Sequence, residues 1–404
     1  MKTDFSKVSG LVDGYKKNMA ETLGRIIEIK AISPKSGGTG EAKRADFLQS
    51  LLKDWGFEPK RYDYIDDTRT KRSNLVAKFG KCKKTLWVIT HMDTVSEGDR
   101  SLWHTDPFKP KISGGKVYGR GANDNGQAVI AGLFALKALK DSGAGMQYNI
   151  GIAIAADEEL GGRYGMQKLV REGIFKHDDY FVVSDFGNTR GDEIEIEEKG
   201  VLWLKITVKG KQVHASTPQL GVNAYRYAMR FLLYLDEYLH KKYNAKDRLY
   251  KMPSTFEMTK HEKNVDSTNI VPGIDVSYLD CRILPKYSPE AVLSDIKRIA
   301  RMSAFKKAKI NVDVVNMETA PRTDKKSEIA RMLGCAIKEL RGIDVKYVGM
   351  GGGTDAKPLR QRGIDAVAWG TQHDIAHQPN EFAETKEMVD DAKVFAYLCL
   401  TQKS

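Results

Sequence analysis

The chain has 404 residues, of which 41% are hydrophobic and 29% are charged, and its formal net charge is +12 at pH 7. This length exceeds one ordinary hydrophobic core and predicts two domains. The sequence contains no run of about 18 apolar residues, so we expect no membrane partner. The polar N-terminus shows no apolar signal segment, and the four cysteines form no Cys-x-x-Cys pair. Both features predict a cytoplasmic protein.

The excess positive charge is scattered in short lysine clusters such as Lys241-Lys242 and Lys306-Lys307. No basic stretch is interleaved with aromatic residues, as a nucleic-acid-binding surface would require. We therefore interpret most of the charge as solvated surface and expect no nucleic-acid partner.

The first half of the chain predicts helices that alternate with strands. Apolar residues spaced three and four apart indicate helices, and nearly continuous apolar runs indicate strands covered on both faces. In chain order these are helices over 19–29 and 47–55, strands over 74–79 and 85–90, a helix over 127–140, and strands over 150–156 and 180–183. This alternation is typical of an α/β layer fold, in which ligands bind outside the carboxyl ends of the strands.

The pattern changes near residue 198. A strand over 202–209, a helix over 223–241, a strand over 274–280, a helix over 289–302 and a strand over 310–315 follow. This β-α-β-β-α-β-like stretch predicts an open-faced domain inserted at 198–316. The α/β pattern resumes with a helix over 329–341. The α/β domain is thus expected to be discontinuous, over 1–197 and 317–404.

Five separated side chains have the chemistry of metal ligands. His91, Glu159 and Asp185 follow predicted strands, which places them at one edge of one sheet. Asp124 lies in a Gly-rich turn, and His377 lies in a loop near the C-terminus. Two imidazoles with three carboxylates suit a pair of divalent ions such as zinc.

Each residue alone has an ordinary alternative explanation. A histidine such as His91 after an apolar strand is more often buried and hydrogen-bonded than a ligand. Asp124 could belong to a simple turn, and Glu158-Glu159 could end a solvated loop. His377 could be an ordinary loop histidine, and the neighbouring His373, to which we assign no role, shows how a lone histidine misleads. Taken together and in this order, the five side chains favour a metal site.

The donor set also predicts how the ions are shared. Asp124 would bridge both ions, with His91 and Asp185 on one of them and Glu159 and His377 on the other. Two divalent ions bring four positive charges against three carboxylates, which leaves room for one bridging hydroxide. A metal-bound water has a pKa of about 7, so hydroxide would be available at neutral pH.

Two further carboxylates complete the predicted site. Glu158 has no ligand role in this arrangement and would act as the general base and acid. Asp93 lies two residues beyond His91, so both side chains point the same way if the strand continues. Asp93 would then accept a hydrogen bond from the far ring nitrogen of His91 and fix its tautomer.

The chain resembles the M20 family of dinuclear zinc peptidases and amidohydrolases. This family includes aminoacylases, acetylornithine deacetylases, succinyl-diaminopimelate desuccinylases, carnosinase-type dipeptidases and glutamate carboxypeptidases. The resemblance covers almost the whole chain. Besides the ligand motifs, it rests on residues 103–108 with 119–122, 213–218 with 221–224, 268–273, 280–282 and 352–356.

The resemblance implies a zinc-peptidase-like, three-layer α/β/α catalytic domain with an inserted ferredoxin-like α+β lid and dimerisation domain. It implies a homodimer in which His214 polarises the substrate carbonyl in the partner's site. It also implies substrate contacts from Asn269, Arg282 and Gly353, with Arg282 suited to a carboxylate. Cobalt or manganese could replace the two zinc ions. Alternatively, Arg282 forms a structural ion pair and His214 is a surface-strand histidine.

The chain departs from many relatives at two places. Residues 124–127 read Asp-Asn-Gly-Gln, where relatives often have Asp-Asp-Lys-Gly or Asp-Met-Lys-Gly. Asp185 occupies a position where desuccinylases and glutamate carboxypeptidases have Glu. Aspartate at this position is more similar to dipeptidases, aminotripeptidases and acetylornithine deacetylases.

We therefore predict a dinuclear metal-dependent hydrolase. It would cleave the amide bond of a small N-acyl amino acid or dipeptide by attack of a bridging hydroxide, with Glu158 as general base. The alternatives are a succinyl-diaminopimelate desuccinylase or a carboxypeptidase proper. A metal-dependent nuclease and a non-catalytic binding protein are less favoured.

Overall fold

The computed structural model describes residues 2–319 and 321–400 and divides into two compact units. The first unit extends to Ile196 and resumes at Arg322–Tyr347 and again from Gly353, so it is discontinuous in sequence. The second unit contains Glu197–Pro321 and Val348–Gly352. The sequence analysis leaves the latter segment in the first domain. Within the described residues, no helix combines the length and apolarity needed to cross a membrane.

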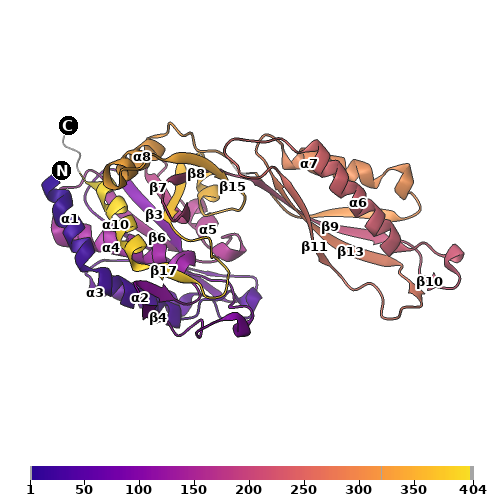
Figure 1. Cartoon of the computed structure of the whole chain (residues 1–404), viewed down its shortest axis with the longest axis horizontal. Helices are drawn as coiled ribbons and strands as arrows, with labels where there is room; N and C mark the ends of the chain where they lie inside the picture. The colour runs from indigo at the N-terminus through magenta and orange to yellow at the C-terminus, as the bar shows by residue number, and fades with distance from the viewer. Residues whose placement is uncertain (1, 320, 401–404) are drawn as a thin grey trace. The chain divides into compact units, whose positions relative to one another are not determined.

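A large mixed sheet forms the centre of the first unit (Figure 1). Its strand order is β1-β2-β6-β3-β7-β16-β8-β15. The strands are β1 (Lys60–Ile65), β2 (Lys71–Phe79), β3 (Thr85–His91), β6 (Asn149–Ala155), β7 (Tyr180–Asn188), β8 (Glu193–Glu198), β15 (Lys346–Met350) and β16 (Ala366–Thr371). The adjacent strands β6, β3, β7 and β16 are parallel, so their carboxyl ends meet at the same edge.

Helices cover both faces of this sheet. They are α1 (Lys2–Gly14), α2 (Lys16–Glu28), α3 (Ala42–Asp54), α4 (Gln127–Ser142), α5 (Met166–Arg171), α8 (Glu328–Arg341), α9 (Ala356–Arg360) and α10 (Thr385–Cys399). On one face α4 packs on β6 and β3, and α1 and α10 pack against α4 (Figure 1). On the other face, Met166 and Leu169 of α5 and Leu359 of α9 share a core cluster with Trp87 and Phe181.

The strand that carries Asp185 is longer than predicted. The sequence indicates a strand over 180–183 that ends before Asp185, whereas β7 continues to Asn188. The extension comes from pairing with a strand that is distant in sequence, because after a register shift β16 pairs with β7 again at Gly187 and Asn188. The first residues of β7 are apolar and buried, whereas the residues after 183 lack an apolar run. The local sequence pattern therefore does not indicate that the strand continues.

The sequence analysis also misses α1 and treats the first residues as a polar N-terminus. Val8 and Val12 of this helix are fully buried, and the ring of Phe5 makes an edge contact with Tyr397 of α10, with centroids 5.1 Å apart. Two valines in a polar stretch are too few to give a clear helical period in the sequence. The helix is instead held by packing against α4 and α10.

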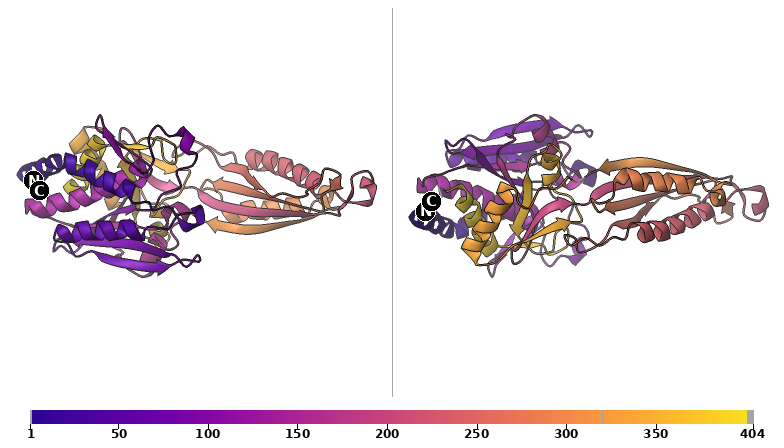
Figure 2. Two further views of the ribbon diagram at one scale, coloured as in Figure 1. Left: turned by 90° about the horizontal axis from the view of Figure 1, so that it is seen from below. Right: turned by 90° about the horizontal axis from the view of Figure 1, so that it is seen from above.

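The second unit is an open-faced α+β sandwich. It contains β9 (Gly200–Lys209), α6 (Ala224–Lys242), β11 (Thr255–His261), β13 (Ile274–Ile283), α7 (Pro289–Ala300) and β14 (Lys309–Glu318). The sheet is antiparallel in the order β11-β13-β9-β14. Alternate residues of β9, such as Leu204 and Ile206, form one core with both helices, and Figure 2 shows α6 along the sheet.

Two small sheets complete the fold. The first pairs β10 (Val213–His214) with β12 (Ile270–Val271), and the second joins β17 (Phe382–Glu384), β5 (Lys116–Tyr118) and β4 (Lys111–Ser113). The chain order of the second unit, β-α-β-β-α-β, is the ferredoxin-like order. The predicted fold class, a three-layer catalytic domain with an inserted ferredoxin-like domain, is confirmed.

A buried carboxylate joins the two helices of the second unit. Asp295 of α7 accepts hydrogen bonds from Lys242 Nζ at 2.5 Å and Tyr243 Oη at 2.6 Å, both at the end of α6. Arg298 adds a third hydrogen bond of 3.1 Å. Burial acts to raise the pKa of Asp295, but these donors outweigh it and hold the pKa at about 2.

We expect Asp295→Asn to lower the free energy of unfolding by about 1–2 kcal/mol at pH 7, because the ionised form is the one that the fold stabilises. The folded pKa lies below the unfolded value of about 3.9, so this stability is present above about pH 4 and is lost as the pH falls towards 2. Urea unfolding of both proteins at pH 7 and pH 3 measures the difference. A difference of equal size at both pH values would contradict this assignment.

Candidate metal centre

All five predicted ligands lie in the first unit, at the edge where the parallel strands end. His91 is the last residue of β3, and Glu159 lies in the turn after β6. Asp185 lies within β7, and Asp124 lies in the turn that precedes α4. His377 reaches the same place from the loop between β16 and β17. Four chain segments besides β3 therefore bring these side chains to one place.

The carboxylate of Asp124 lies between two imidazoles. Its Oδ1 is 3.0 Å from His91 Nε2, and its Oδ2 is 3.2 Å from His377 Nε2. One oxygen thus faces each histidine, which is the arrangement that a bridging carboxylate requires. The Asp124 side chain is 15% exposed, whereas the His377 side chain is 54% exposed, so the position between the histidines is open to solvent on the His377 side.

The remaining carboxylates divide between the two histidines. Asp185 Oδ1 lies 3.6 Å from His91 Nε2, and Glu159 Oε2 lies 3.0 Å from His377 Nε2. Glu158, to which the sequence analysis gives no ligand role, also has an oxygen within 4.8 Å of the ligand atoms of His91 and Asp185. Glu158 is therefore close enough to exchange a proton with a molecule held there.

These residues fit a pair of divalent cations. Zinc binds imidazole nitrogen and carboxylate oxygen at about 2.1 Å, so two ligands of one tetrahedral ion lie about 3.4 Å apart. The separations of 3.0 to 3.6 Å around His91 and His377 bracket this value. The donor set of nitrogen and oxygen atoms also suits cobalt and manganese.

Asp93 presents two oxygens to the far ring nitrogen of His91. Its backbone carbonyl, 3.1 Å from His91 Nδ1, is the nearest acceptor for that ring nitrogen, while its Oδ1 lies 3.5 Å away. The carboxylate accepts the backbone N–H groups of Glu158 at 3.0 Å and Glu159 at 3.2 Å. Asp93 thus orients His91 through its main chain and fixes the Glu158-Glu159 turn through its side chain.

Glu381 is a functional residue that the sequence analysis passes over. Its fully buried carboxylate accepts N–H groups from Gly121 at 3.0 Å, Asn123 at 2.8 Å and Asp124 at 2.9 Å. It also pairs with Arg120 at 2.6 Å. Because Glu381 is four residues beyond His377, it fastens the Asp124 turn to the His377 loop. Its place beside the His377 motif is the one sequence signal that could have identified it.

Asn125 stands at the position where the chain departs from many relatives. Its Nδ2 donates to Asp185 Oδ1 at 2.9 Å and to the carbonyl of Ser184 at 2.8 Å. Its Oδ1 accepts the backbone N–H of His91 at 3.3 Å. Asn125 therefore ties β3 to β7 and orients Asp185 beside His91.

The pKa values reflect strong crowding of carboxylates. Burial and the nearby charge of Asp124 raise the pKa of Glu159 to about 7. Burial, with Asp185, raises the pKa of Glu158 well above its ordinary value. Burial acts to raise the pKa of Asp124, but hydrogen bonds from His377 and His91 hold it below its ordinary range. The same contacts with Asp124 and Glu159 raise the pKa of His377 to about 10.

Asp355 is a further buried acid near the site that has no role in the sequence analysis. It is 4% exposed, and its Oδ2 has no hydrogen-bond partner among the described residues. Burial raises its pKa well above the ordinary value, opposed by His91 and reinforced by Asp185.

Three of the four predicted substrate residues belong to a different unit from the metal-ligand cluster. His214, Asn269 and Arg282 belong to the second unit, and Gly353 begins a segment of the first. His214 is exposed and its Nδ1 lies 2.7 Å from Ser216 Oγ. Arg282 makes a two-point ion pair with Asp280 at 2.8 and 3.1 Å, so the structural alternative for this residue is present.

A family model described as peptidase family M20/M25/M40 matches residues 87–401. The chain belongs to this family. It is 38% identical to an uncharacterized metallohydrolase of Methanocaldococcus jannaschii over 394 residues, covering 92% of this chain and 96% of the relative. It is 27% identical to a succinyl-diaminopimelate desuccinylase of a Sulfurovum species over 387 residues, covering 94% and 97%.

Among solved structures, the fold is similar to an M20 family metallo-carboxypeptidase of Sulfolobus solfataricus. The TM-score is 0.74 at 20% sequence identity, and the match covers 94% of this chain and 98% of that one. The M20/M25/M40 family relationship makes this chain a metallohydrolase. The expected M20 resemblance is confirmed.

Glu381→Gln is expected to weaken zinc binding by about 10- to 100-fold, as loss of an outer partner of metal ligands does. The amide keeps the size of the side chain but removes the charge that holds the Asp124 turn. Competition with a chelator measures the affinity. Glu237→Gln, on the exposed side of α6, is the matched control. Equal affinity in Glu381→Gln and wild type would show that Glu381 does not position the ligands.

Proposed function

We propose that this M20 metallohydrolase is a dinuclear amidohydrolase that cleaves the amide bond of a small N-acyl amino acid or dipeptide. The observation that carries the proposal is the Asp124 carboxylate, which presents one oxygen to His91 and the other to His377. Glu158 supports it, because an oxygen of this acid lies within 4.8 Å of the ligand atoms of His91 and Asp185.

Each side chain has a defined task in this proposal. His91 and Asp185 would hold one ion, Glu159 and His377 the other, and Asp124 both. Bound divalent ions supply Lewis acidity, which lowers the pKa of a water to about 7 and polarises a carbonyl group.

Glu158 would accept the proton of the attacking water and deliver it to the departing nitrogen. Such general acid–base transfer contributes about 10²–10⁴-fold. Its efficiency depends on position, and Asp93 supports that position by binding the backbone N–H groups of Glu158 and Glu159.

The substrate assignment remains part of the proposal. Arg282 would bind the carboxylate next to the scissile amide and Asn269 would contact the substrate. His214 would polarise the carbonyl in the partner subunit's site, and the backbone at Gly353 would contact the acid group. The desuccinylase relative keeps succinyl-diaminopimelate hydrolysis as the main alternative, and a carboxypeptidase is the other. Asp185 favours a dipeptidase or deacetylase, and a panel of N-acetyl, N-succinyl and dipeptide substrates separates these possibilities.

We expect Glu158→Ala to retain two bound ions and to lose at least about 10²-fold in kcat, because it removes the proton carrier. Asp124→Ala is the contrasting variant, and we expect it to lose metal as well as activity. Metal analysis and steady-state kinetics of the two variants test this. Wild-type turnover in Glu158→Ala would exclude the proposed mechanism.

The second unit offers a surface for the proposed homodimer. Tyr225, Met229 and Leu233 of α6 recur every fourth residue and are 42%, 43% and 64% exposed. They form an apolar stripe beside the buried face of the helix that carries Ala228 and Leu235. An exposed apolar stripe of this kind marks an interaction surface, and we propose that a second copy of the chain covers it.

Leu233→Glu is expected to shift the protein from dimer to monomer, because a charge would be buried at the most exposed residue of the stripe. Leu102→Glu, at a similarly exposed leucine of the first unit, is the control. Sedimentation at several protein concentrations gives the oligomeric state. The proposed interface is wrong if Leu233→Glu stays dimeric or if the wild type is a monomer.

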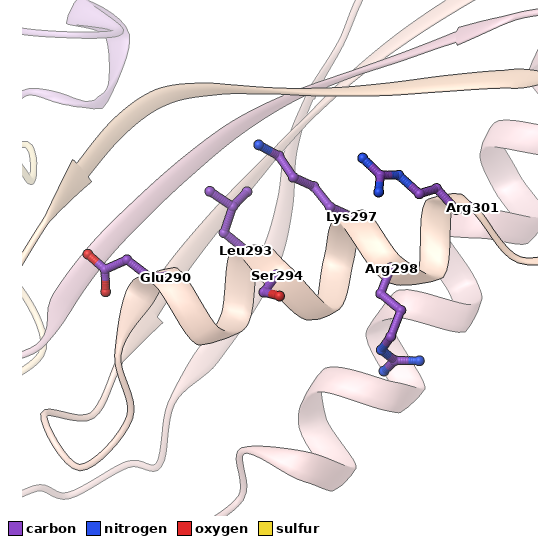
Figure 3. Close-up of a pocket in the computed structure, with 6 residues that line it drawn as sticks. All are labelled: Glu290, Leu293, Ser294, Lys297, Arg298 and Arg301. Carbon is purple, nitrogen blue, oxygen red and sulfur yellow. The ribbon is translucent and has the colours of Figure 1, made fainter.

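A metal-dependent nuclease has less support, although the net charge is +12. The basic side chains Lys297, Arg298 and Arg301 line a shallow pocket along α7. In Figure 3, Lys297 and Arg301 point to one side of the helix and Arg298 to the other, where it pairs with Asp295. These cations do not converge on one phosphate. A steep loss of DNA affinity with rising salt would revive the nuclease alternative.

A further inference from the structure

A second set of ligand-type side chains lies in the first unit, outside the dinuclear cluster. His373 follows β16, Glu384 ends β17, and Glu387 lies in the first turn of α10. His373 Nε2 is 3.3 Å from a carboxylate oxygen of Glu384 and 3.3 Å from one of Glu387. These distances match the separation of about 3.4 Å expected for two ligands of one tetrahedral ion.

The polar atoms of this set lack the hydrogen bonds that burial demands. Glu387 is only 7% exposed, and its Oε2 has no hydrogen-bond partner among the described residues. The same holds for Nε2 of His373, which is buried and makes close contacts without hydrogen-bond geometry. Unsatisfied buried atoms of this kind are costly, and a cation between the three side chains would satisfy both of them.

The charges in this region also favour a cation. Burial, with the neighbouring charges of Glu384 and Asp391, raises the pKa of Glu387 to about 8. Lys116 Nζ lies 3.4 Å from Glu384 and gives that carboxylate one positive charge. A divalent ion would neutralise Glu387 without a proton and would leave His373 as a neutral ligand.

A solvent-accessible pocket reaches this place. Its volume is about 610 Å³, and Thr371, Glu384 and Glu387 are among its lining residues. Three protein ligands leave at least one position of a tetrahedral ion for a water molecule from this pocket. An entry path and an open coordination position are both needed for a cation to bind and exchange.

We propose that His373, Glu384 and Glu387 bind a third divalent cation, of the class that nitrogen and carboxylate ligands favour, with zinc as the test ion. Its role is structural. The ion connects His373 at the start of the loop between β16 and β17 with Glu384 and Glu387 at its end. Closing a loop in this way lowers the entropy lost when the loop is ordered.

The closed loop is the one that carries His377 and Glu381. His377 and Asn380 adopt left-handed backbone conformations, with φ of 64° and 62°, which cost energy for residues other than glycine. The main chain of His373 also pairs with the Asn123 side chain, at 3.2 and 3.3 Å, next to Asp124. The third ion would therefore hold the loop in the shape that presents His377 to Asp124.

The test is to strip the full-length protein of metal, reload it with zinc and count the bound ions. The wild type should bind about three equivalents, and Glu387→Gln and His373→Ala should each bind about one fewer. Both variants should also lose the part of the zinc-dependent thermal shift that the third ion contributes. His240→Gln is the control, because His240 contacts Asp236 at 3.2 Å in the second unit and should leave the count unchanged.

The outcomes separate this proposal from the dinuclear one. Asp124→Ala should lose dinuclear-site ions but keep the ion that the Glu387→Gln variant loses. Anomalous diffraction from a zinc-loaded wild-type crystal should show density between His373 and Glu387, which tests the proposal even if a variant does not fold. A wild type with no density there, or a zinc count that Glu387→Gln and His373→Ala leave unchanged, overturns the third site and leaves the dinuclear proposal standing.

Discussion

One carboxylate determines the geometry of the metal centre. Asp124 offers its two oxygens to two imidazoles that arrive from distant parts of the chain, His91 from β3 and His377 from the loop after β16. This arrangement requires the turn around Asp124 to be fixed with little freedom. Glu381 supplies that restraint. Its carboxylate accepts hydrogen bonds from the backbone N–H groups of Gly121, Asn123 and Asp124 and pairs with buried Arg120. A charge-assisted contact of this kind is among the stronger ones available in a protein interior.

The second constraint is electrostatic. Asp93, Asp124, Glu158, Glu159 and Asp185 gather at one sheet edge, and burial raises the pKa of several of them. A cluster of this sign is stable only with protons or cations, so metal binding and the stability of this edge are coupled. The His373 cluster repeats the pattern on a smaller scale, with two carboxylates around one imidazole. By our proposals, the same chemistry would support a catalytic pair of ions and a separate ion that holds the loop.

Much of the site follows from sequence because its supports are local. The apolar runs of β3 and β6 identify strands covered on both faces, and the residues after them are placed by the rule that parallel strands end together. His91 and Glu159 are of this kind. The predicted end of the strand at residue 183 is wrong. The last residues of β7 are held by pairing with β16, and their sequence has no apolar run that would indicate a strand.

Other parts depend on contacts between distant residues and leave little trace in the local sequence. Glu381 acts on a turn about 260 residues away, and a single glutamate in a polar loop carries no periodicity. His373 has no meaning until the fold places it beside Glu384 and Glu387. Asp93 could be placed near His91, but which of its oxygens the ring nitrogen faces depends on the backbone path after β3. All three depend on how the folded chain brings residues together, which the local sequence does not indicate.

The most direct test of the central claim is a structure of the zinc-loaded protein, or an X-ray absorption measurement of the distance between its ions. We predict two ions about 3.5–4 Å apart, as in other two-metal sites, with one oxygen of Asp124 on each ion and Glu158 bound to neither. A single ion at this edge of the sheet, or two ions with both Asp124 oxygens on the same one, would contradict the account.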